Sequence, residues 1–531
     1  MSVQVLITDS LHPICFEMLA DAGFAVVDGS KWTRAEILKS CPEVQGWIIR
    51  SGTTIDAEFL NAAKSLVAIG RAGVGVDNVD IPTATKKGVL VLNAPEGNTI
   101  STAEHTVAML LAMTRKIPPA AASLLSGKWD RKPFTGGELY GKTIGIAGIG
   151  KIGKAVAERC QAFSMTVIGY DPMLTLEAAS KMGVELVELD EMYRRSDFIT
   201  VHTPLIPATT GLLNDETIAK CKVGVGIINC ARGGIVDEDA LLRALESGHV
   251  GAAALDVYST EPPTEALFRL IRHPNVVATP HIAASTEEAQ ENVAIQVTEQ
   301  VINALSGEVV LTAVNALAVR MSAQPEVKPF LLLAERLGSA AHQIFQHPVD
   351  RLLIRCHGDV PRRYKDVLKV VALKGLLAAN WKEPVNLVNA EVIAHESGLV
   401  VDVETFQSEH SFSNLIELRL QGQGHSMSVS GTIFSGEDGR ITSVDEYDVE
   451  IKTQGQSLLY RNTDKPGMLA KVGQILASNE INIGSLSLGR SRPGEEALTA
   501  ITVDQVISDE ILVQVANIEG VNRVCMLEFM P

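Results

Sequence analysis

Three side chains in the middle of the chain have the types that hydride transfer at a secondary alcohol requires. Arg232 stands before Gly-Gly, Glu261 before Pro-Pro, and His281 after Thr-Pro. A histidine titrates near neutral pH, so it can take the proton of a hydroxyl group as hydride leaves the carbon. A carboxylate bonded to the imidazole fixes its tautomer, and a guanidinium can hold a substrate carboxylate through two hydrogen bonds. Each residue alone also fits an ordinary loop, so the interpretation depends on their meeting in space.

The elements expected to bring these residues together are short apolar runs that predict parallel strands. The carboxyl ends of parallel strands share one edge of a sheet, and ligands of open α/β sheets bind at that edge. We therefore expect the polar residues that follow the runs to converge. The runs and their following residues are Phe198–His202 with Thr203, Val225–Cys230 with Arg232, Ala252–Leu255 with Asp256 and Glu261, and Val276–Pro280 with His281.

A glycine-rich turn predicts a dinucleotide site at the same edge. In chain order its parts are a strand (Thr143–Ala147), the glycines Gly148, Gly150 and Gly153, a helix (Lys154–Phe163), and a second strand that ends at Asp171. Glycines permit the tight turn, the approach of backbone to a pyrophosphate, and close packing of helix on strand. Asp171 lies 18 residues after Gly153, close to the spacing of a carboxylate that binds both ribose hydroxyls and repels a 2′-phosphate. The glycines alone would also fit a simple turn, but the full pattern predicts NAD.

Residues 1–96 alternate strands and helices and predict a second doubly wound parallel sheet. Arg50 and Arg71 each follow one of its strands and are flanked by small residues such as Ser51, which suits an anion site. Two solvated surface arginines are the alternative. Asn98 lies where the chain passes toward the glycine turn, and it could bind a ligand or cap a helix.

Composition excludes several classes of function. The chain has 531 residues, a formal net charge of −17 and a pI of about 5.2, so neither nucleic acid nor an anionic membrane is an expected partner. The seven cysteines form no C-x-x-C pair, and His395 and His425 have no ligand-like spacing. We therefore expect reduced thiols, no metal site and a cytoplasmic location. We find no leader-like segment and no run of about 18 apolar residues.

Several runs, taken together and in order, resemble the D-2-hydroxyacid dehydrogenase family. They are Gly70–Asp80, the glycine turn, Val201–Leu205, Asn229–Glu238, Ala254–Val257, Glu261–Pro263 and Thr279–Ser285. The resemblance covers residues 1 to about 310. It implies that Arg232, Glu261 and His281 are the catalytic set. It also implies a NAD site lined by Gly148, Gly150, Lys151, Ile152, Gly153, Asp171, Thr203, Cys230, Ala231, Arg232, Asp256, His281, Ala283 and Ala284.

Within that family, the sequence is most similar to the long members that oxidise 3-phospho-D-glycerate to 3-phosphohydroxypyruvate, the first step of serine synthesis. The similarity implies a substrate site made of Arg50, Ser51, Arg71, Asn98 and Arg232. Arg131-Lys132 resembles a segment that some members extend across a dimer interface. Val74 replaces a threonine seen in part of the family, which puts one hydrogen bond to the cofactor in doubt. Members acting on glyoxylate, hydroxypyruvate or 2-oxoglutarate, and an NAD-sensing binding protein without turnover, remain alternatives.

The C-terminal part predicts two further domains. Residues 311–452 indicate a mixed α+β domain like the intervening domain of those long members, with a structural or oligomerising role or an allosteric anion site. Residues 453–531 predict the order βαββαβ and resemble an ACT domain, a module that senses amino acids. The resemblance implies an L-serine site at Asp464, Asn482 and, more loosely, Asn462. An ACT fold kept only for dimerisation is the alternative.

The complete prediction is an α/β protein with two doubly wound lobes and two smaller domains. The four units are a flavodoxin-like substrate lobe (1–97 and 285–310), a Rossmann NAD lobe (98–284), the intervening domain (311–452) and a ferredoxin-like ACT domain (453–531). We expect a homodimer or homotetramer.

Overall fold

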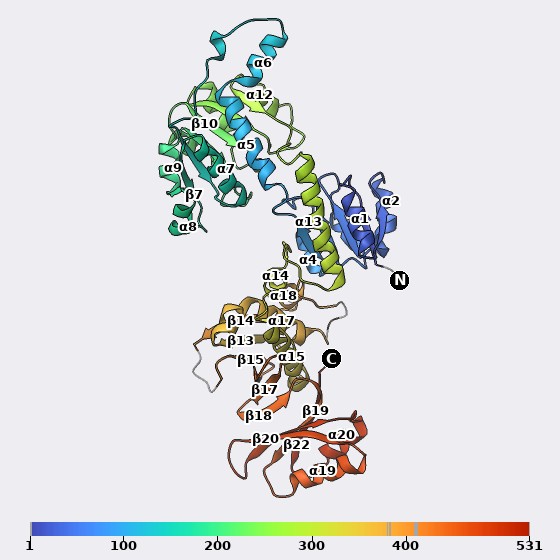
Figure 1. Ribbon diagram of the computed structural model, residues 1–531. Coiled ribbons are helices and arrows are strands. Elements are labelled where there is room, and N and C mark those ends of the chain that lie inside the picture. Colours follow the sequence, from blue (N-terminus) through green and yellow to red (C-terminus); the bar gives the residue numbers. More distant parts are fainter. Residues whose placement is uncertain (1–2, 380, 382–383, 408–411, 530–531) are drawn as a thin grey trace.

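The computed structural model describes residues 3–379, 381, 384–407 and 412–529. Four sheets follow one another along an elongated molecule, with the glycine-turn lobe at one end and the βαββαβ unit at the other (Figure 1). The α/β fold class that the sequence predicts is confirmed. Among the described residues, no helix combines the length and the apolar character needed to cross a membrane.

The first lobe is a five-stranded parallel sheet in the order β2-β1-β3-β4-β5. Its strands are β1 (Gln4–Ile7), β2 (Ala25–Asp28), β3 (Gly46–Ile49), β4 (Ala68–Arg71) and β5 (Leu90–Asn93), and its helices are α1 (Ile14–Asp21), α2 (Arg34–Ser40), α3 (Ala57–Ala62) and α4 (Ile81–Lys86). Helix α13 (Glu287–Ser306) returns from the second lobe and packs against α1, β3, β4 and β5. Its Val297 and Val301 lie so close to Gly70 that a Cβ there would collide with both valines.

The second lobe is a seven-stranded parallel sheet in the order β12-β11-β10-β9-β6-β7-β8. Its strands are β6 (Thr143–Ala147), β7 (Thr166–Tyr170), β8 (Glu185–Leu186), β9 (Phe198–Val201), β10 (Val225–Asn229), β11 (Val250–Leu255) and β12 (Val276–Ala278). Its helices are α5 (Thr99–Thr114), α6 (Ile117–Leu125), α7 (Lys151–Ala162), α8 (Leu176–Lys181), α9 (Leu189–Arg195), α10 (Asp215–Ala219), α11 (Glu238–Glu246) and α12 (Leu267–Ile271). Two apolar clusters, one with α5 and α7 and one with α9 to α12, fill the lobe.

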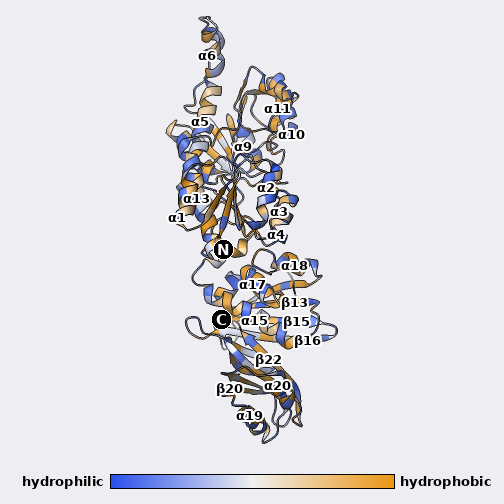
Figure 2. Ribbon diagram, turned by 90° about the vertical axis from the view of Figure 1, so that its right-hand side faces the viewer, coloured by the Kyte–Doolittle hydropathy of each residue, from blue (hydrophilic) through white to orange (hydrophobic). Residues whose placement is uncertain are grey.

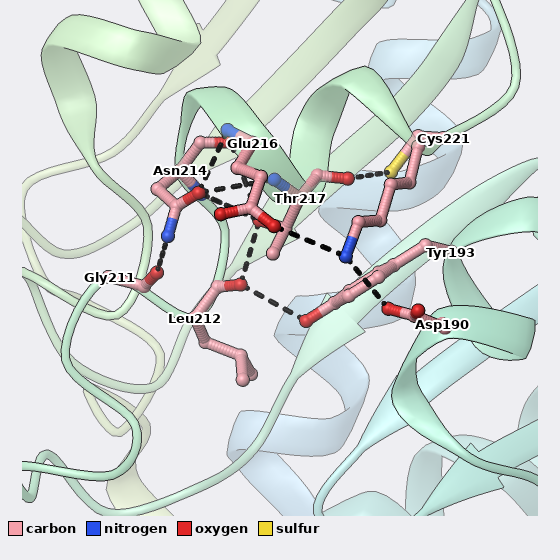
Figure 3. A network of polar contacts seen from close by, with 9 residues as sticks. Asp190, Tyr193, Gly211, Leu212, Asn214, Glu216, Thr217 and Cys221 are labelled. Carbon is pink, nitrogen blue, oxygen red and sulfur yellow. Dashed lines mark hydrogen bonds and ion pairs between the residues drawn. The ribbon is translucent and has the colours of Figure 1, made fainter.

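Local hydrogen bonds explain several of these boundaries. Helix α7 starts at Lys151, three residues before the predicted start, because Gly150 is already its N-cap residue. Figure 3 shows how Asn214 begins α10: its Oδ1 accepts from the backbone of Glu216 and Thr217, at 3.0 and 3.1 Å. The hydroxyls of Thr217 and Tyr193 both donate to the carbonyl of Leu212. The backbone N–H of Asn214 in turn donates to the hydroxyl of Thr217 at 2.9 Å, and this capping box fixes the end of the loop that begins after β9.

The third domain has a six-stranded sheet in the order β14-β13-β15-β16-β17-β18, parallel between β13 and β14 and antiparallel elsewhere. Its elements are α14 (Leu317–Ser322), α15 (Lys328–Phe345), β13 (Arg351–His357), α16 (Asp359–Arg363), α17 (Lys365–Leu377), α18 (Ala390–Glu396), β14 (Val400–Phe406), β15 (Leu415–Gly422), β16 (His425–Ile433), β17 (Gly439–Val444) and β18 (Tyr447–Lys452). Helices α15 and α17 pack closely because Gly338 and Gly375 face backbone of the opposite helix.

The fourth domain has the predicted βαββαβ order. Its elements are β19 (Gly455–Thr463), α19 (Met468–Ser478), β20 (Ile483–Arg490), β21 (Glu496–Val503), α20 (Asp509–Ala516) and β22 (Val521–Phe529). The antiparallel sheet has the order β20-β21-β19-β22. Helices α19 and α20 cover one face, whereas Leu459, Leu498 and Leu527 belong to the core of the third domain. The two C-terminal domains therefore share one apolar core.

Candidate active site

The two lobes face each other across a cleft of about 640 Å³. The cleft is lined by residues from the ends of β3 and β4 on one side and from the loops after β10, β11 and β12 on the other. The predicted site residues that line it are Arg50, Ser51, Arg71, Asn98, Arg232, Glu261, His281 and Ala284. Side chains separated by more than 200 positions in the sequence thus meet in one cavity.

Glu261 and His281 are hydrogen-bonded to each other at the mouth of the second lobe. Nδ1 of His281 lies 2.6 Å from Oε2 of Glu261, and the second carboxylate oxygen accepts from the backbone N–H of Tyr258 at 3.0 Å. This contact occupies Nδ1, which leaves Nε2 as the nitrogen available to a substrate. His281 has a left-handed backbone with φ of 54°, so its loop must be held in place by other contacts.

Asp256 supplies most of those contacts. Its side chain is fully buried, and it accepts from the hydroxyl of Thr279 at 2.5 Å and from the N–H groups of Ile282 and Ala283 at 2.9 Å. Its own carbonyl accepts from the N–H of His281 at 2.8 Å. Burial raises the pKa of Asp256, but hydrogen bonds from His105, Thr279 and the two backbone groups outweigh it and lower the pKa. Asp256 is therefore a carboxylate that anchors the histidine loop.

Arg232 reaches the cleft from the loop after β10. Asn229 donates to its carbonyl at 2.9 Å, and its guanidinium donates to the carbonyl of Ala231 at 2.7 Å. The next residue, Gly233, packs on the carbonyl of Tyr258 so tightly that a Cβ would overlap it. This close approach brings the arginine loop beside the loop that holds Glu261.

Two polar groups on the first-lobe side of the cleft are buried without a hydrogen-bond partner among the described residues. They are Nε of Arg71 and Oδ1 of Asn98. Asn98 stands at the start of α5 but makes no side-chain cap bond. Burial lowers the pKa of Arg71, and the charges of Arg232 and Arg50 lower it further. Three guanidinium groups that repel one another are suited to a ligand with more than one negative charge.

The glycine turn after β6 has the shape that a dinucleotide requires. Gly148 has φ of +91°, a Cβ at Gly153 would overlap the carbonyl of Gly148, and no atom lies within 4 Å of a Cβ built at Gly150. Helix α7 begins at Lys151 without a side-chain cap, so its first N–H groups can face a pyrophosphate. The carboxylate of Asp171 accepts hydrogen bonds from the backbone N–H groups of Ile149 and Met173, at 2.9 and 2.8 Å.

The remaining predicted cofactor residues lie around the same sheet edge. Thr203 has a buried hydroxyl without a partner among the described residues, and Cys230 is a buried thiol whose pKa burial raises to about 12. Lys151 forms an ion pair with Glu96, which precedes α5. An unpartnered hydroxyl, a neutral thiol and an acid at the end of β7 thus lie along the sheet edge where dinucleotides bind in this fold.

Family comparisons agree with this geometry. Three family models match: the NAD-binding domain of D-isomer specific 2-hydroxyacid dehydrogenases over residues 107–283, the D-3-phosphoglycerate dehydrogenase intervening domain over 326–445, and the ACT domain over 457–520. The D-3-phosphoglycerate dehydrogenase of Bacillus subtilis is 40% identical over 525 residues, 99% of both chains. That of Homo sapiens is 41% identical over 502 residues, 93% of both chains. This chain belongs to the D-3-phosphoglycerate dehydrogenase family.

Solved structures are similar to this chain over somewhat more than half of its length. The TT0316 protein of Thermus thermophilus is 34% identical with a TM-score of 0.54, over 59% of this chain and all of that one. A D-lactate dehydrogenase of Aquifex aeolicus, solved with NAD and lactic acid, is 27% identical with a TM-score of 0.52, over 57% of this chain and 96% of that one. Membership of the D-3-phosphoglycerate dehydrogenase family confirms the resemblance seen in the sequence, and NAD is the cofactor.

One pair of predicted effector residues does not meet within a chain. Asp464 pairs with Arg490, the last residue of β20, at 3.2 Å, whereas Asn482 precedes the first residue of β20 and donates to Asp504 at 2.6 Å. The eight residues of β20 separate the two by roughly 25 Å at about 3.3 Å per residue. Asn462 is buried and donates to the carbonyl of Thr463. Within one chain, Asp464 and Asn482 therefore lie near opposite ends of β20, and the L-serine site stays a prediction.

Sequence reasoning missed the residues that hold the Arg50 loop. Asp9 accepts from the backbone N–H of Arg50 and from the hydroxyl of Thr53, and Asn78 donates to the carbonyls of Arg50 and Thr53 at 2.7 and 2.6 Å. His12, which also lines the cleft, follows β1. The signal was available for Asp9 and His12, because both lie just after a parallel strand of the same sheet.

Proposed function

We propose that the chain oxidises 3-phospho-D-glycerate at C2 with NAD, giving 3-phosphohydroxypyruvate and NADH, as the first step of L-serine synthesis. The main observation in favour of this function is the cleft, which Arg50, Arg71 and Arg232 line together with the Glu261–His281 pair. A phosphate and a carboxylate at opposite ends of one small substrate supply the charges that three guanidinium groups require.

In the proposed mechanism, Arg50, Ser51 and Arg71 hold the phosphate, with Asn98 beside them. Arg232 binds the substrate carboxylate and the developing carbonyl oxygen. Nε2 of His281 takes the proton of the 2-hydroxyl group, and Glu261 stabilises the imidazolium that forms. When bound, NAD accepts the hydride from C2. Closure of the lobes removes water, which strengthens each of these contacts.

The test compares phosphorylated and unphosphorylated acids by NADH absorbance. We expect activity with 3-phospho-D-glycerate, and an Arg50→Ala variant should raise KM for it by about 10- to 100-fold, or roughly 1.4–3 kcal/mol. The KM of the same variant for D-glycerate should change less than threefold. Faster turnover of glyoxylate or hydroxypyruvate by the wild type would favour the sister dehydrogenases. Binding of NAD without turnover of any acid would favour a sensor.

We also propose that the protein is a homodimer or homotetramer in the cytoplasm. Helix α6 stands clear of the second lobe in both views (Figures 1 and 2), and its segment exposes apolar side chains, including 90% of Leu125 and 79% of Trp129. Exposed apolar patches of this kind mark interfaces. Arg131 and Lys132 belong to the same projecting segment. All seven cysteines are free and buried, which supports a reducing compartment.

The separation of Asp464 from Asn482 supports an L-serine site that two chains share. Strand β20 is an edge strand with Leu486 and Leu488 exposed by 42% and 44%. If two copies pair through β20 about a twofold axis, the start of one strand meets the end of the other. Asn482 of one chain then lies beside Asp464 of its partner, where they can bind the carboxylate and ammonium of serine.

A further inference from the structure

His105 lies under the catalytic loop, although no motif drew attention to it. It belongs to α5, which packs against β11 and β12, and its side chain is 19% exposed. Its Nε2 lies 3.2 Å from the hydroxyl oxygen of Thr279 and 3.4 Å from Oδ1 of Asp256. The histidine thus reaches from a helix to the two side chains at the root of the His281 loop.

The surroundings of Asp256 explain why such a partner matters. A fully buried carboxylate is costly unless hydrogen bonds or a positive charge compensate it. The ionisable side chains around it include Cys230 and Tyr258, which stay neutral because burial raises the pKa of each to about 12. Glu261 adds a second negative charge, and His281 belongs to the loop itself. His105 supplies an N–H group from α5.

We propose that His105 is a positioning residue for the oxidation: by binding Asp256 and Thr279, it keeps the left-handed His281 loop where the imidazole meets Glu261. The inference rests on the proposed role of His281 as the base. The chain of contacts is continuous: His105 to Thr279 and Asp256, Asp256 to the N–H groups of residues 281 to 283 through its carbonyl and carboxylate, and His281 to Glu261.

Loss of His105 has an electrostatic consequence besides a geometric one. Without its partner, the loop that carries His281 moves away from Glu261, whose carboxylate then stabilises the protonated imidazole less. The acid limb of the pH profile of kcat/KM for oxidation therefore moves to lower pH, as in a variant that lacks the Glu261 charge. A purely structural defect would lower activity at all pH values without moving that limb.

The test compares His105→Ala and His105→Gln, because the glutamine amide keeps an N–H donor at similar reach. We expect His105→Ala to lower kcat roughly 10- to 100-fold, with KM for 3-phospho-D-glycerate within about threefold, and to move the acid limb down by roughly half a pH unit. His105→Gln should recover most of kcat. His249→Ala is the matched control, since it removes a histidine bond to the carbonyl of Ile218 in the same lobe; it should lower Tm but leave kcat and the pH profile unchanged.

Several outcomes would overturn the inference. Wild-type kcat and an unmoved acid limb in His105→Ala would do so, as would a glutamine variant that folds but is no better than alanine. If His105→Ala fails to fold, His105→Leu replaces it as the variant without an N–H donor, and a leucine variant with the kcat and acid limb of the glutamine variant overturns the inference. All profiles use whichever 2-hydroxy acid the wild type oxidises best. An inactive wild type with every acid refutes the proposed function, and the inference falls with it.

Discussion

At the scale of single residues, the site depends on contacts that fix one nitrogen, one charge or one loop. Asp9 and Asn78 hold the Arg50 loop through its backbone, and Glu261 occupies Nδ1 of His281. The types and order of Arg232, Glu261 and His281 were visible in the sequence, because each follows an apolar run that forms a parallel strand. Their partners were harder to see. Asn78 and His105 lie in a loop and on a helix, and only tertiary packing brings them to the site.

The charge of Glu261 should control the pH dependence of the reaction. In Glu261→Gln, the amide oxygen can still accept from Nδ1 of His281, but the negative charge that stabilises the imidazolium is gone. We expect kcat to fall roughly 10- to 100-fold and the acid limb of kcat/KM to move to lower pH, because the protonated imidazole becomes less favourable. Initial rates between pH 5 and 9 measure both effects.

Glu238→Gln is the control for this prediction. Glu238 accepts a hydrogen bond from the backbone N–H of Ser259, which lies in the loop that holds Glu261. Among the described residues, no hydrogen bond joins Glu238 to His281. Its substitution should leave the acid limb where it is. An equal movement in both variants would show that loop charge in general, and not the Glu261–His281 pair, sets the profile.

At the scale of elements, the loop after β10 packs directly against the loop after β11, and Gly233 lies at the contact. A Cβ at Gly233 would overlap the carbonyl of Tyr258, so in Gly233→Ala the loop after β10 must separate from the loop after β11. Arg232 then moves away from Glu261. We expect kcat/KM for 3-phospho-D-glycerate to fall by about 100-fold, since small displacements of a positioned group are costly. NAD binding, followed by fluorescence quenching, should weaken less than fivefold.

Gly234→Ala tests whether the close approach is the cause. Gly234 has φ of +79°, but the nearest atom to its Cβ would be a Leu205 methyl at 3.7 Å. Alanine there costs roughly 1–2 kcal/mol of backbone strain without a collision, so Tm should fall while kcat/KM changes less than tenfold. A larger loss of kcat/KM in Gly234→Ala than in Gly233→Ala would contradict the explanation.

The elements show which parts of the fold a sequence can reveal. Strand positions and the βαββαβ order follow from apolar periodicity and turn residues, and these predictions are confirmed. The shared core of the two C-terminal domains was not predictable, because Leu459, Leu498 and Leu527 look like ordinary inward strand residues. The left-handed backbone of His281 was also hidden, since nothing local favours it and Asp256, just after β11, holds it through the N–H groups of His281 and Ile282.

At the scale of the whole molecule, the C-terminal domains are attached to the first lobe, which carries Arg50 and Arg71. Asn315 accepts from Val91 and donates to the carbonyl of Val89, and Asn386 donates to the carbonyl of Gly88. The ACT domain is joined in turn by the ion pair of Arg461 with Asp445. An effector that changes how two ACT domains pair can therefore act on the first lobe, and a coupling of about 1–3 kcal/mol would suffice to regulate closure.

The proposed serine site between two chains predicts complementation between two variants that are each insensitive to serine. Asp464→Ala and Asn482→Ala oligomers should each need at least about tenfold more serine for half inhibition, measured by NADH absorbance with 3-phospho-D-glycerate. A mixed dimer of one Asp464→Ala chain and one Asn482→Ala chain can be isolated by two affinity tags. One of its two interface sites carries both alanines. The other combines Asp464 of one chain with Asn482 of its partner and is intact.

The mixed dimer should therefore recover about half of the wild-type inhibition, because one of its two sites binds serine. A doubly tagged Asp464→Ala dimer serves as the control and should recover none. If both residues acted within a single chain, every chain of the mixed dimer would lack one of them, and it would be as insensitive as its parents. A wild type that ignores serine altogether would instead leave the ACT domain with a dimerising role, so the three possibilities give three different titration curves.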